Sequence, residues 1–131
     1  MDKQALKKQI HQKLFEKLND YGFNKKVSDN KFKRAFKEGV HILHLAYLSK
    51  IDGFDVVLNV AIRFEKLEEL KTRYREDISK KEKKQTASLG VEYGNLTGIG
   101  QHRWKIRQEE DVDVAVESIF LAIKETMIPY L

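Results

Sequence analysis

The chain has 131 residues, one proline and 41% hydrophobic residues, which fits a single domain over residues 1–131 with one core. It has no cysteine, so disulfides and thiolate metal sites are excluded, and the chain is compatible with a reducing cytosol. The net charge of +5 is uneven, because residues 1–50 have twelve Lys and Arg against five acidic residues and residues 51–131 have thirteen against fifteen. A basic half suits an anionic partner, although a charge run more often forms a solvated face.

The first segment, MDKQALKKQIHQKLFEKL, predicts an amphipathic helix of roughly four turns. Its apolar residues recur every fourth position, at Leu6, Ile10, Leu14 and Leu18. The helix is expected to end near Gly22, which can adopt the left-handed cap conformation. The segment lacks the apolar region of a signal peptide, and no stretch of about 18 apolar residues could cross a bilayer. We therefore expect a cytoplasmic protein without a membrane span.

Three consecutive segments alternate apolar and polar residues with the period of a β-strand. They are KFKRAFK, GVHILHLAYL and GFDVVLNVAIRF. Glu38-Gly39 and Asp52-Gly53 are predicted as the two-residue turns between them. These turns pair Phe36 with His41 and Ile51 with Phe54, and they place the apolar residues of all three strands on one face of the sheet.

His41 and His44 lie three residues apart in the second of these strands. Side chains three apart in a strand point to opposite faces, so the two histidines cannot bind one metal ion together. We expect His41 at the rim of the core. His44 is expected on the other face, in a row with Lys33 and Ala61.

The second half of the chain predicts two more strands between two helices. Residues 66–79 form the first helix, with Leu67, Leu70 and Tyr74 facing inward, and the lysine-rich SKKEKKQT after it is typical of a solvated, mobile loop. The segments SLGVEYGN and QHRWKIR alternate like strands, with the glycine-rich GNLTGIG as the hairpin connection between them.

The last segment, DVDVAVESIFLAIKETMIPYL, predicts the final helix. The apolar residues on its inner face are Val112, Val116, Ile119 and Ile123. Acidic residues cluster at its start, and Pro129 is expected to follow its end. The predicted fold is therefore of α+β class, an antiparallel sheet of about five strands with helices packed on one face, in the order α-β-β-β-α-β-β-α.

No catalytic or metal-binding motif stands out. The four histidines are scattered, and the sequence has neither HExxH nor GxSxG, so no metal and no cofactor are expected. Asp55 and Glu92 are predicted to face solvent, and Trp104 to lie in the core because it shares the strand parity of Ile106.

The far face of the predicted sheet is the candidate binding surface, because it mixes cationic and apolar residues. The partner-binding residues that we expect there are Lys31, Lys33, Lys37, His44, Asn59, Arg63, Arg103 and Lys105. The alternative explanation is an ordinary solvated sheet face, on which the lysines serve to prevent edge strands from pairing with other chains.

The succession YGFNKK, FKRAFKEGVHILHL, FDVVLNVAIRF, GQHRWKI and MIPYL resembles the bacterial domain-of-unknown-function 4304 family. The resemblance covers nearly the whole chain and rests on the spacing and a few positions: Gly22-Phe23, Phe32, Asn59, Trp104 and Pro129. The chain departs from the family at Ala61, where glycine is usual. The resemblance implies a small cytoplasmic bacterial α+β protein with no established activity, and it supplies no catalytic residues.

From these observations we expect a non-enzymatic interaction domain that binds a protein partner through the basic sheet face. A toxin-neutralising immunity protein is the concrete example, although the acidic character usual for such proteins is missing. The alternative is a nucleic-acid-binding domain that uses the same cations, and the lack of exposed aromatic residues in the first three strands weighs against it. A third hypothesis is an enzyme with His44, Asn59 and Arg63 in a shallow pocket. The sequence leaves the oligomeric state open.

Overall fold

A computed structural model describes residues 2–23, 25–27, 30–83 and 86–131. Its strands are β1 (Lys25–Val27), β2 (Lys31–Phe36), β3 (Gly39–Lys50), β4 (Gly53–Phe64), β5 (Leu89–Glu92) and β6 (Trp104–Ile106). Its α-helices are α1 (Lys3–Leu18), α2 (Glu65–Thr72), α3 (Lys80–Lys83), α4 (Tyr93–Thr97), α5 (Asp111–Ala122) and α6 (Ile128–Tyr130). A 3-10 turn, Asn19–Tyr21, follows α1, and a π-helical turn, Ile123–Met127, joins α5 to α6. The α+β class is confirmed.

The described residues form an antiparallel sheet of six strands, in which β4 pairs with three of the others. β3 pairs with β4 along its whole length on one side, and β2 and β1 follow beyond β3. On the other side β4 pairs with two short strands, β6 at residues 54–56 and β5 at residues 59–62. β5 and β6 therefore share one edge of β4 and do not form the hairpin predicted from the sequence.

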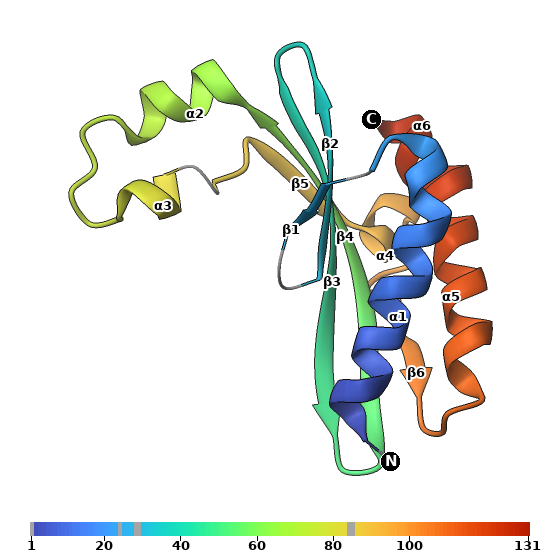
Figure 1. The fold of residues 1–131 in the computed structure, drawn as a ribbon. Helices are drawn as coiled ribbons and strands as arrows, with labels where there is room; N and C mark the ends of the chain where they lie inside the picture. The colour runs from blue at the N-terminus through green and yellow to red at the C-terminus, as the bar shows by residue number, and fades with distance from the viewer. Residues whose placement is uncertain (1, 24, 28–29, 84–85) are drawn as a thin grey trace.

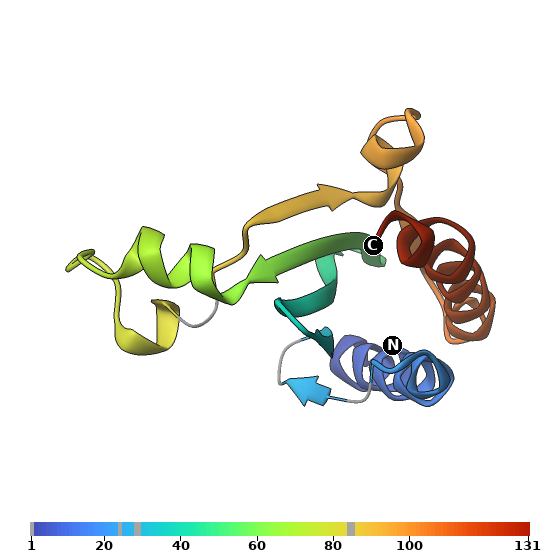
Figure 2. The same ribbon diagram turned by 90° about the horizontal axis from the view of Figure 1, so that it is seen from above.

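Helices α1 and α5 lie side by side against one face of the sheet, which we call the helix-covered face (Figures 1 and 2). The two helices are linked at their surface by the ion pairs Lys13–Asp113 and Lys17–Glu117. The predicted apolar residues of both helices are buried, as are alternate residues of the strands, such as Leu43, Leu45 and Leu58. Trp104 lies in the same core, as predicted, and its indole N–H donates to Ser118 Oγ at 2.8 Å.

Both hairpins differ from the predicted register by two residues. Phe36 lies opposite Gly39, and Lys50 lies opposite Gly53, so the turns are Lys37-Glu38 and Ile51-Asp52. Side chains alternate with period two along a strand, and a shift of two residues therefore keeps each side chain on its predicted face. The face assignment is confirmed, whereas the predicted pairs Phe36–His41 and Ile51–Phe54 are wrong.

The glycines of these hairpins are needed inside the strands and not at the turns. A Cβ atom on Gly39 would lie 1.7 Å from the carbonyl oxygen of Arg63, and one on Gly53 would lie 1.9 Å from the carbonyl oxygen of Ile106. Each glycine thus allows a neighbouring strand to approach at the end of the sheet. An Xaa-Gly pair between two strands usually predicts a two-residue turn, so the sequence places Gly39 and Gly53 in the turns. The predicted strand register is therefore shifted by two residues.

Helices α2 and α3 form an arm, residues 65–83, that projects from the end of β4 on the side away from α1 and α5 (Figures 1 and 2). The prediction that Leu67, Leu70 and Tyr74 face inward is wrong, because all three are exposed. The buried side chains of α2 are Glu68 and Thr72, which face the returning chain: Ser88 Oγ donates to Glu68 Oε2 at 2.8 Å. The helix is also shorter than predicted and ends at Thr72.

Three further segments differ from the prediction in detail. GNLTGIG is not a simple loop, because its first residues lie in α4, which ends at Gly98 in the left-handed conformation. Pro129 lies within α6 and not after the last helix. In SKKEKKQT, Lys80–Lys83 form α3 where a loop was predicted, and residues 84–85 lie outside the described residues.

The close approach at Gly39 gives a stability prediction. Gly39→Ala should lower the free energy of unfolding by about 1–3 kcal/mol, because the new methyl group would collide with the backbone of β4. Gly90→Ala is the matched control, since a Cβ there would meet its nearest atom at an ordinary 3.5 Å, and it should change stability by less than about 0.5 kcal/mol. Urea denaturation measures both. Equal effects of the two substitutions would contradict the packing described for Gly39.

Candidate functional site

The face of the sheet opposite α1 and α5 has no helix packed over it among the described residues, and we call it the open face (Figures 1 and 2). Strand alternation and the register place on it Lys31, Lys33, Ala35, Val40, Ile42, His44, Ala46, Leu48, Asp55, Val57, Asn59, Ala61, Arg63, Gly90, Glu92 and Lys105. A polar row crosses its middle, apolar residues lie on both sides of this row, and Arg63 and Asp55 lie near the two ends of the face.

A row of polar residues crosses four strands of the open face. Lys31 lies opposite His44, His44 opposite Asn59, and Asn59 opposite Glu92. Asn59 Nδ2 and His44 Nδ1 are 3.4 Å apart. The predicted row of His44 with Lys33 and Ala61 is wrong, because the two-residue register shift replaces both neighbours.

A shallow hollow of ≈ 450 Å³ surrounds this polar row. Its apolar lining consists of small or branched residues, namely Ile42, Val60, Ala61, Ala87, Gly90 and Val91. Lys31, His44, Asn59 and Glu92 complete the lining. The hollow therefore offers an ammonium group at one end, a carboxylate at the other and two neutral hydrogen-bonding groups between them.

The imidazoles of His44 and His41 are both held in the neutral form, on opposite faces of the sheet. Burial and the positive charge of Lys31 lower the pKa of His44, and burial and the charge of Arg34 lower the pKa of His41. His41 accepts from Arg34 Nε at 3.1 Å and stacks on Phe36 at 4.4 Å, so it belongs to the packing of the helix-covered face. Near neutral pH, His44 is therefore a neutral hydrogen-bonding group and not a cation.

Glu92 is buried, so the prediction that it faces solvent is wrong. Its carboxylate accepts from the backbone N–H groups of Gly94 and His102 and caps the start of α4. Glu92 thus fixes the chain that leaves β5 and also places negative charge at the end of the polar row.

Asp55 is likewise buried, with 2% of its surface exposed, and the prediction of a solvent-facing side chain is wrong for it too. Arg107 donates to Asp55 Oδ1 at 2.8 Å, and Arg103 lies 3.4 Å from Oδ2. Burial by itself raises the pKa of Asp55, but the hydrogen bonds and charges of the two arginines outweigh it and hold that pKa below its ordinary value. The predicted partner-binding residue Arg103, which is exposed, therefore shares the single negative charge of Asp55 with Arg107.

Arg63, another predicted partner-binding residue, is 5% exposed and serves the fold. Its Nε donates to Glu65 at 3.0 Å, and its guanidinium donates to the carbonyl and hydroxyl oxygens of Thr86 at 2.7 and 2.8 Å. It thereby joins the first residue of the arm, and the chain that returns from the arm at Thr86, to β4. Arg63 also lies four residues from Asn59 along β4, about 13 Å away. The structure does not bring Arg63 together with the His44–Asn59 pair as the enzyme hypothesis requires.

The other three predicted lysines lie at different places. Lys33 is one row from the polar row, opposite Ile42. Lys105 is exposed and lies opposite Asp55. Lys37 is in the exposed turn between β2 and β3, off the open face. Of the eight predicted residues, the structure gathers Lys31, His44 and Asn59 into one site, and the sequence missed Glu92 because its burial depends on the chain turning into α4.

Within the described residues no group of three or more His, Asp or Glu side chains is placed to hold a metal ion. None of the described helices is both long enough and apolar enough to span a membrane. Comparisons with protein-family models, curated proteins and solved structures found no match for the chain. The resemblance to the domain-of-unknown-function 4304 family therefore stays a prediction.

The pKa of His44 tests the contact across the polar row. Lys31→Gln should raise this pKa, because it removes a positive charge, but the pKa should stay below 6.5 since burial is the larger cause. Titration of the imidazole ring protons by NMR measures the change. Lys105→Gln, at the other end of the open face, is the control that should leave the pKa of His44 unaltered; an identical response to both substitutions would rule out the Lys31 contact.

Asp55 gives a second prediction for the open face. Asp55→Asn should lower the free energy of unfolding at neutral pH by about 1–3 kcal/mol, because both arginines lose a buried anionic acceptor. The pKa of Asp55 is lowered in the folded chain, so the stabilisation is complete above the ordinary value of 3.8 and disappears as the pH falls through the lower folded value. The difference in the free energy of unfolding between wild type and Asp55→Asn should therefore become smaller at acidic pH.

The control for Asp55 is Asp52→Asn. Asp52 also pairs with Arg107, at 3.3 Å, but its side chain is exposed, and an exposed pair contributes at most about 1 kcal/mol. Chemical denaturation at several pH values compares the two variants. A loss of stability for Asp52→Asn as large as that for Asp55→Asn would show that burial of Asp55 is not what matters.

Proposed function

We propose that the chain is a non-enzymatic interaction domain that binds a protein partner through the open face. The observation that carries this proposal is a set of apolar residues on a sheet face over which no described helix packs. Val40 and Ile42 lie on one side of the polar row, and Ala46, Val57 and Leu48 lie on its other side, toward Asp55. We call these five residues the apolar centre, which the polar row crosses. A protein interface usually combines such apolar residues with hydrogen-bonding groups.

The charges of the open face favour a protein over a nucleic acid as the partner. Arg63 is paired with Glu65, and Arg103 with Asp55, so these cations are less available to phosphates. Protein surfaces that bind single-stranded nucleic acids usually carry aromatic side chains on which the bases stack. The described residues of the open face include no Phe, Tyr or Trp. Lys31, Lys33 and Lys105 supply positive charge at the rim, which suits a partner with acidic side chains around an apolar contact.

The concrete form that we propose is a bacterial immunity protein that neutralises a toxin domain in the cytoplasm. A chain without cysteine suits a reducing compartment. Such a role needs tight binding and no chemistry, which agrees with a site formed by side-chain packing and a few hydrogen bonds. The apolar centre would provide the affinity and Lys31 the recognition of an acidic residue on the toxin.

Co-purification from the native cell tests the proposal. The wild-type chain should retain one protein in stoichiometric amount. Ala46→Glu, which puts a charge in the apolar centre, and Lys31→Glu, which reverses the rim charge, should each weaken binding at least tenfold. Val114→Glu on α5 is the matched control and should bind like wild type, because Val114 is exposed on the opposite side of the molecule. Thermal unfolding of all four proteins confirms that they are folded.

Two results would overturn the proposal. One is a partner that Ala46→Glu and Lys31→Glu retain as well as wild type does. The other is retention of nucleic acid instead of protein, with an affinity that falls steeply with salt and is lost on Lys31→Glu, since that response indicates phosphate contacts.

A further inference from the structure

Strand β3 is longer than its neighbour β2 at one end of the sheet. β2 begins at Lys31, opposite His44, and beyond this pair β3 continues from Leu45 to Lys50. β4 pairs with this part of β3 on one side. On the other side, the backbone bond that a described residue makes to it is the one from Leu45 N–H to the carbonyl oxygen of Asn30, at 2.9 Å. The rest of this half of β3, from residue 46 to residue 50, is a free edge of the sheet.

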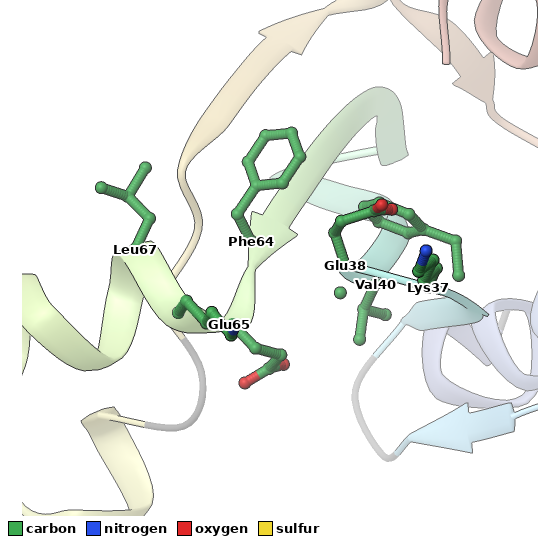
Figure 3. Close-up of a pocket in the computed structure, with 9 residues that line it drawn as sticks. Lys37, Glu38, Val40, Phe64, Glu65 and Leu67 are labelled. Atoms are coloured by element: carbon green, nitrogen blue, oxygen red, sulfur yellow. The ribbon is translucent and has the colours of Figure 1, made fainter.

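The opposite end of β3 has no such free edge. There β2 stays paired with β3 up to the turn Lys37-Glu38, and the pair Phe36–Gly39 closes the hairpin. This turn lies across a hollow of ≈ 690 Å³ from the end of β4 and the start of α2 (Figure 3). The free edge is therefore confined to the half of β3 that lies away from the arm (Figure 1).

Two residues of the free edge direct their backbone groups away from β4. The N–H and C=O groups of one residue point to the same side of an antiparallel strand, and this side alternates along the chain. Leu45 donates away from β4, so Tyr47 and Ser49 direct their N–H and C=O groups the same way. Within the described residues no backbone group pairs with them on that side. Donors and acceptors that repeat every about 7 Å along a line fit the main chain of another strand.

The free edge borders the apolar centre of the open face. Ala46 and Leu48 alternate with the two edge residues, and their side chains point to the open face. A strand added to this edge would therefore lay every second side chain next to Ala46 and Leu48. The other edges of the described sheet are formed by β1, β5 and β6, which have three or four residues and are separated from β3 by β2 or β4.

Two lysines of α1 border the free edge on the helix-covered face. Lys3 Nζ donates to Ser49 Oγ at 3.3 Å, and Lys7 Nζ lies 5.5 Å from the ring centroid of Tyr47. Neither lysine forms an ion pair with a carboxylate of the described residues. Two copies of this edge paired about Leu48 would place Ser49 opposite Tyr47, so Lys3 of one copy would meet Lys7 of the other. These charges oppose pairing with a second copy and favour a strand that carries acidic side chains.

We propose that the protein partner of the open face adds a strand to the sheet at Tyr47 and Ser49 of β3. This inference rests on the proposed function, because the strand belongs to the same partner. The added segment is extended, with apolar side chains toward the apolar centre and acidic side chains toward Lys3 and Lys7. Its main chain exchanges hydrogen bonds with the N–H and C=O groups of the two edge residues. In complexes of this kind the main-chain bonds provide affinity and the alternate side chains provide specificity.

Hydrogen exchange of the backbone amides, followed by NMR, tests the added strand. In the free chain the amides of Tyr47 and Ser49 should exchange rapidly, whereas those of Ala46 and Leu48, which point to β4, should be protected. Binding of the co-purified partner should slow exchange at Tyr47 and Ser49 by about tenfold or more. Protection of these two amides in the free chain would overturn the proposal. If that protection disappears on dilution, the edge pairs with a second copy instead.

Proline substitution tests the contribution of the free edge to binding. Ser49→Pro removes one outward donor, and the sheet tolerates it because that N–H makes no bond to β4. The variant should retain the partner about tenfold or more weakly. Ser49→Ala is the matched control and should bind like wild type, because it loses the same hydroxyl but keeps the N–H group. Thermal unfolding shows whether both variants are folded, and the exchange measurement on the wild-type chain does not depend on them.

The outcomes separate this inference from the proposed function. A partner that binds but leaves Tyr47 and Ser49 unprotected would overturn the added strand alone, as would a folded Ser49→Pro chain that binds like wild type. In either case the proposed function stands if Ala46→Glu still weakens binding. A chain that retains no protein would overturn the proposed function itself, and the added strand with it.

Discussion

The structure depends on the pairing of β3 with β4 over twelve residues each. This ladder fixes which side chains of β4 face α1 and α5, because every residue of β4 lies opposite a defined residue of β3. It also makes β4 the support for everything that joins the sheet later in the chain, including β5, β6 and the arm. At each end of this pair a neighbouring strand approaches closely. Gly39 and Gly53 make this possible, because they have no Cβ atom and leave room for the carbonyl oxygens of Arg63 and Ile106.

The same ladder explains why charged residues are buried on a face that lacks a covering helix. β4 is central, so side chains from strands on both sides shield its residues Asp55 and Arg63. Each has found an opposite charge, and these pairs reduce the excess positive charge that the sequence suggests for this face. What distinguishes the open face is then its apolar centre and the polar row from Lys31 to Glu92, not its net charge.

Much of the architecture could be predicted because it follows from short-range periodicity. The period of four at Leu6 to Leu18 and the period of two in the three long strands identify buried faces directly, and a register error of two residues leaves those faces unchanged. The arm could not be predicted in this way. Leu67, Leu70 and Tyr74 have the spacing of a buried face, but no sheet lies beneath them, and only the three-dimensional path of the chain reveals this. The polar row could not be predicted because it depends on the exact register of the strands. The burial of Glu92 could not be predicted because it depends on the position of α4.

The division of one β4 edge between β5 and β6 has a consequence for how the protein behaves when crowded. A single long strand at this position would present a continuous series of unsatisfied amide and carbonyl groups, which other chains could extend into a fibre. Two pieces of four and three residues, interrupted by α4, give any incoming strand only a brief template. The molecule can therefore expose apolar side chains for recognition while the backbone at this edge of the sheet offers little for another chain to pair with.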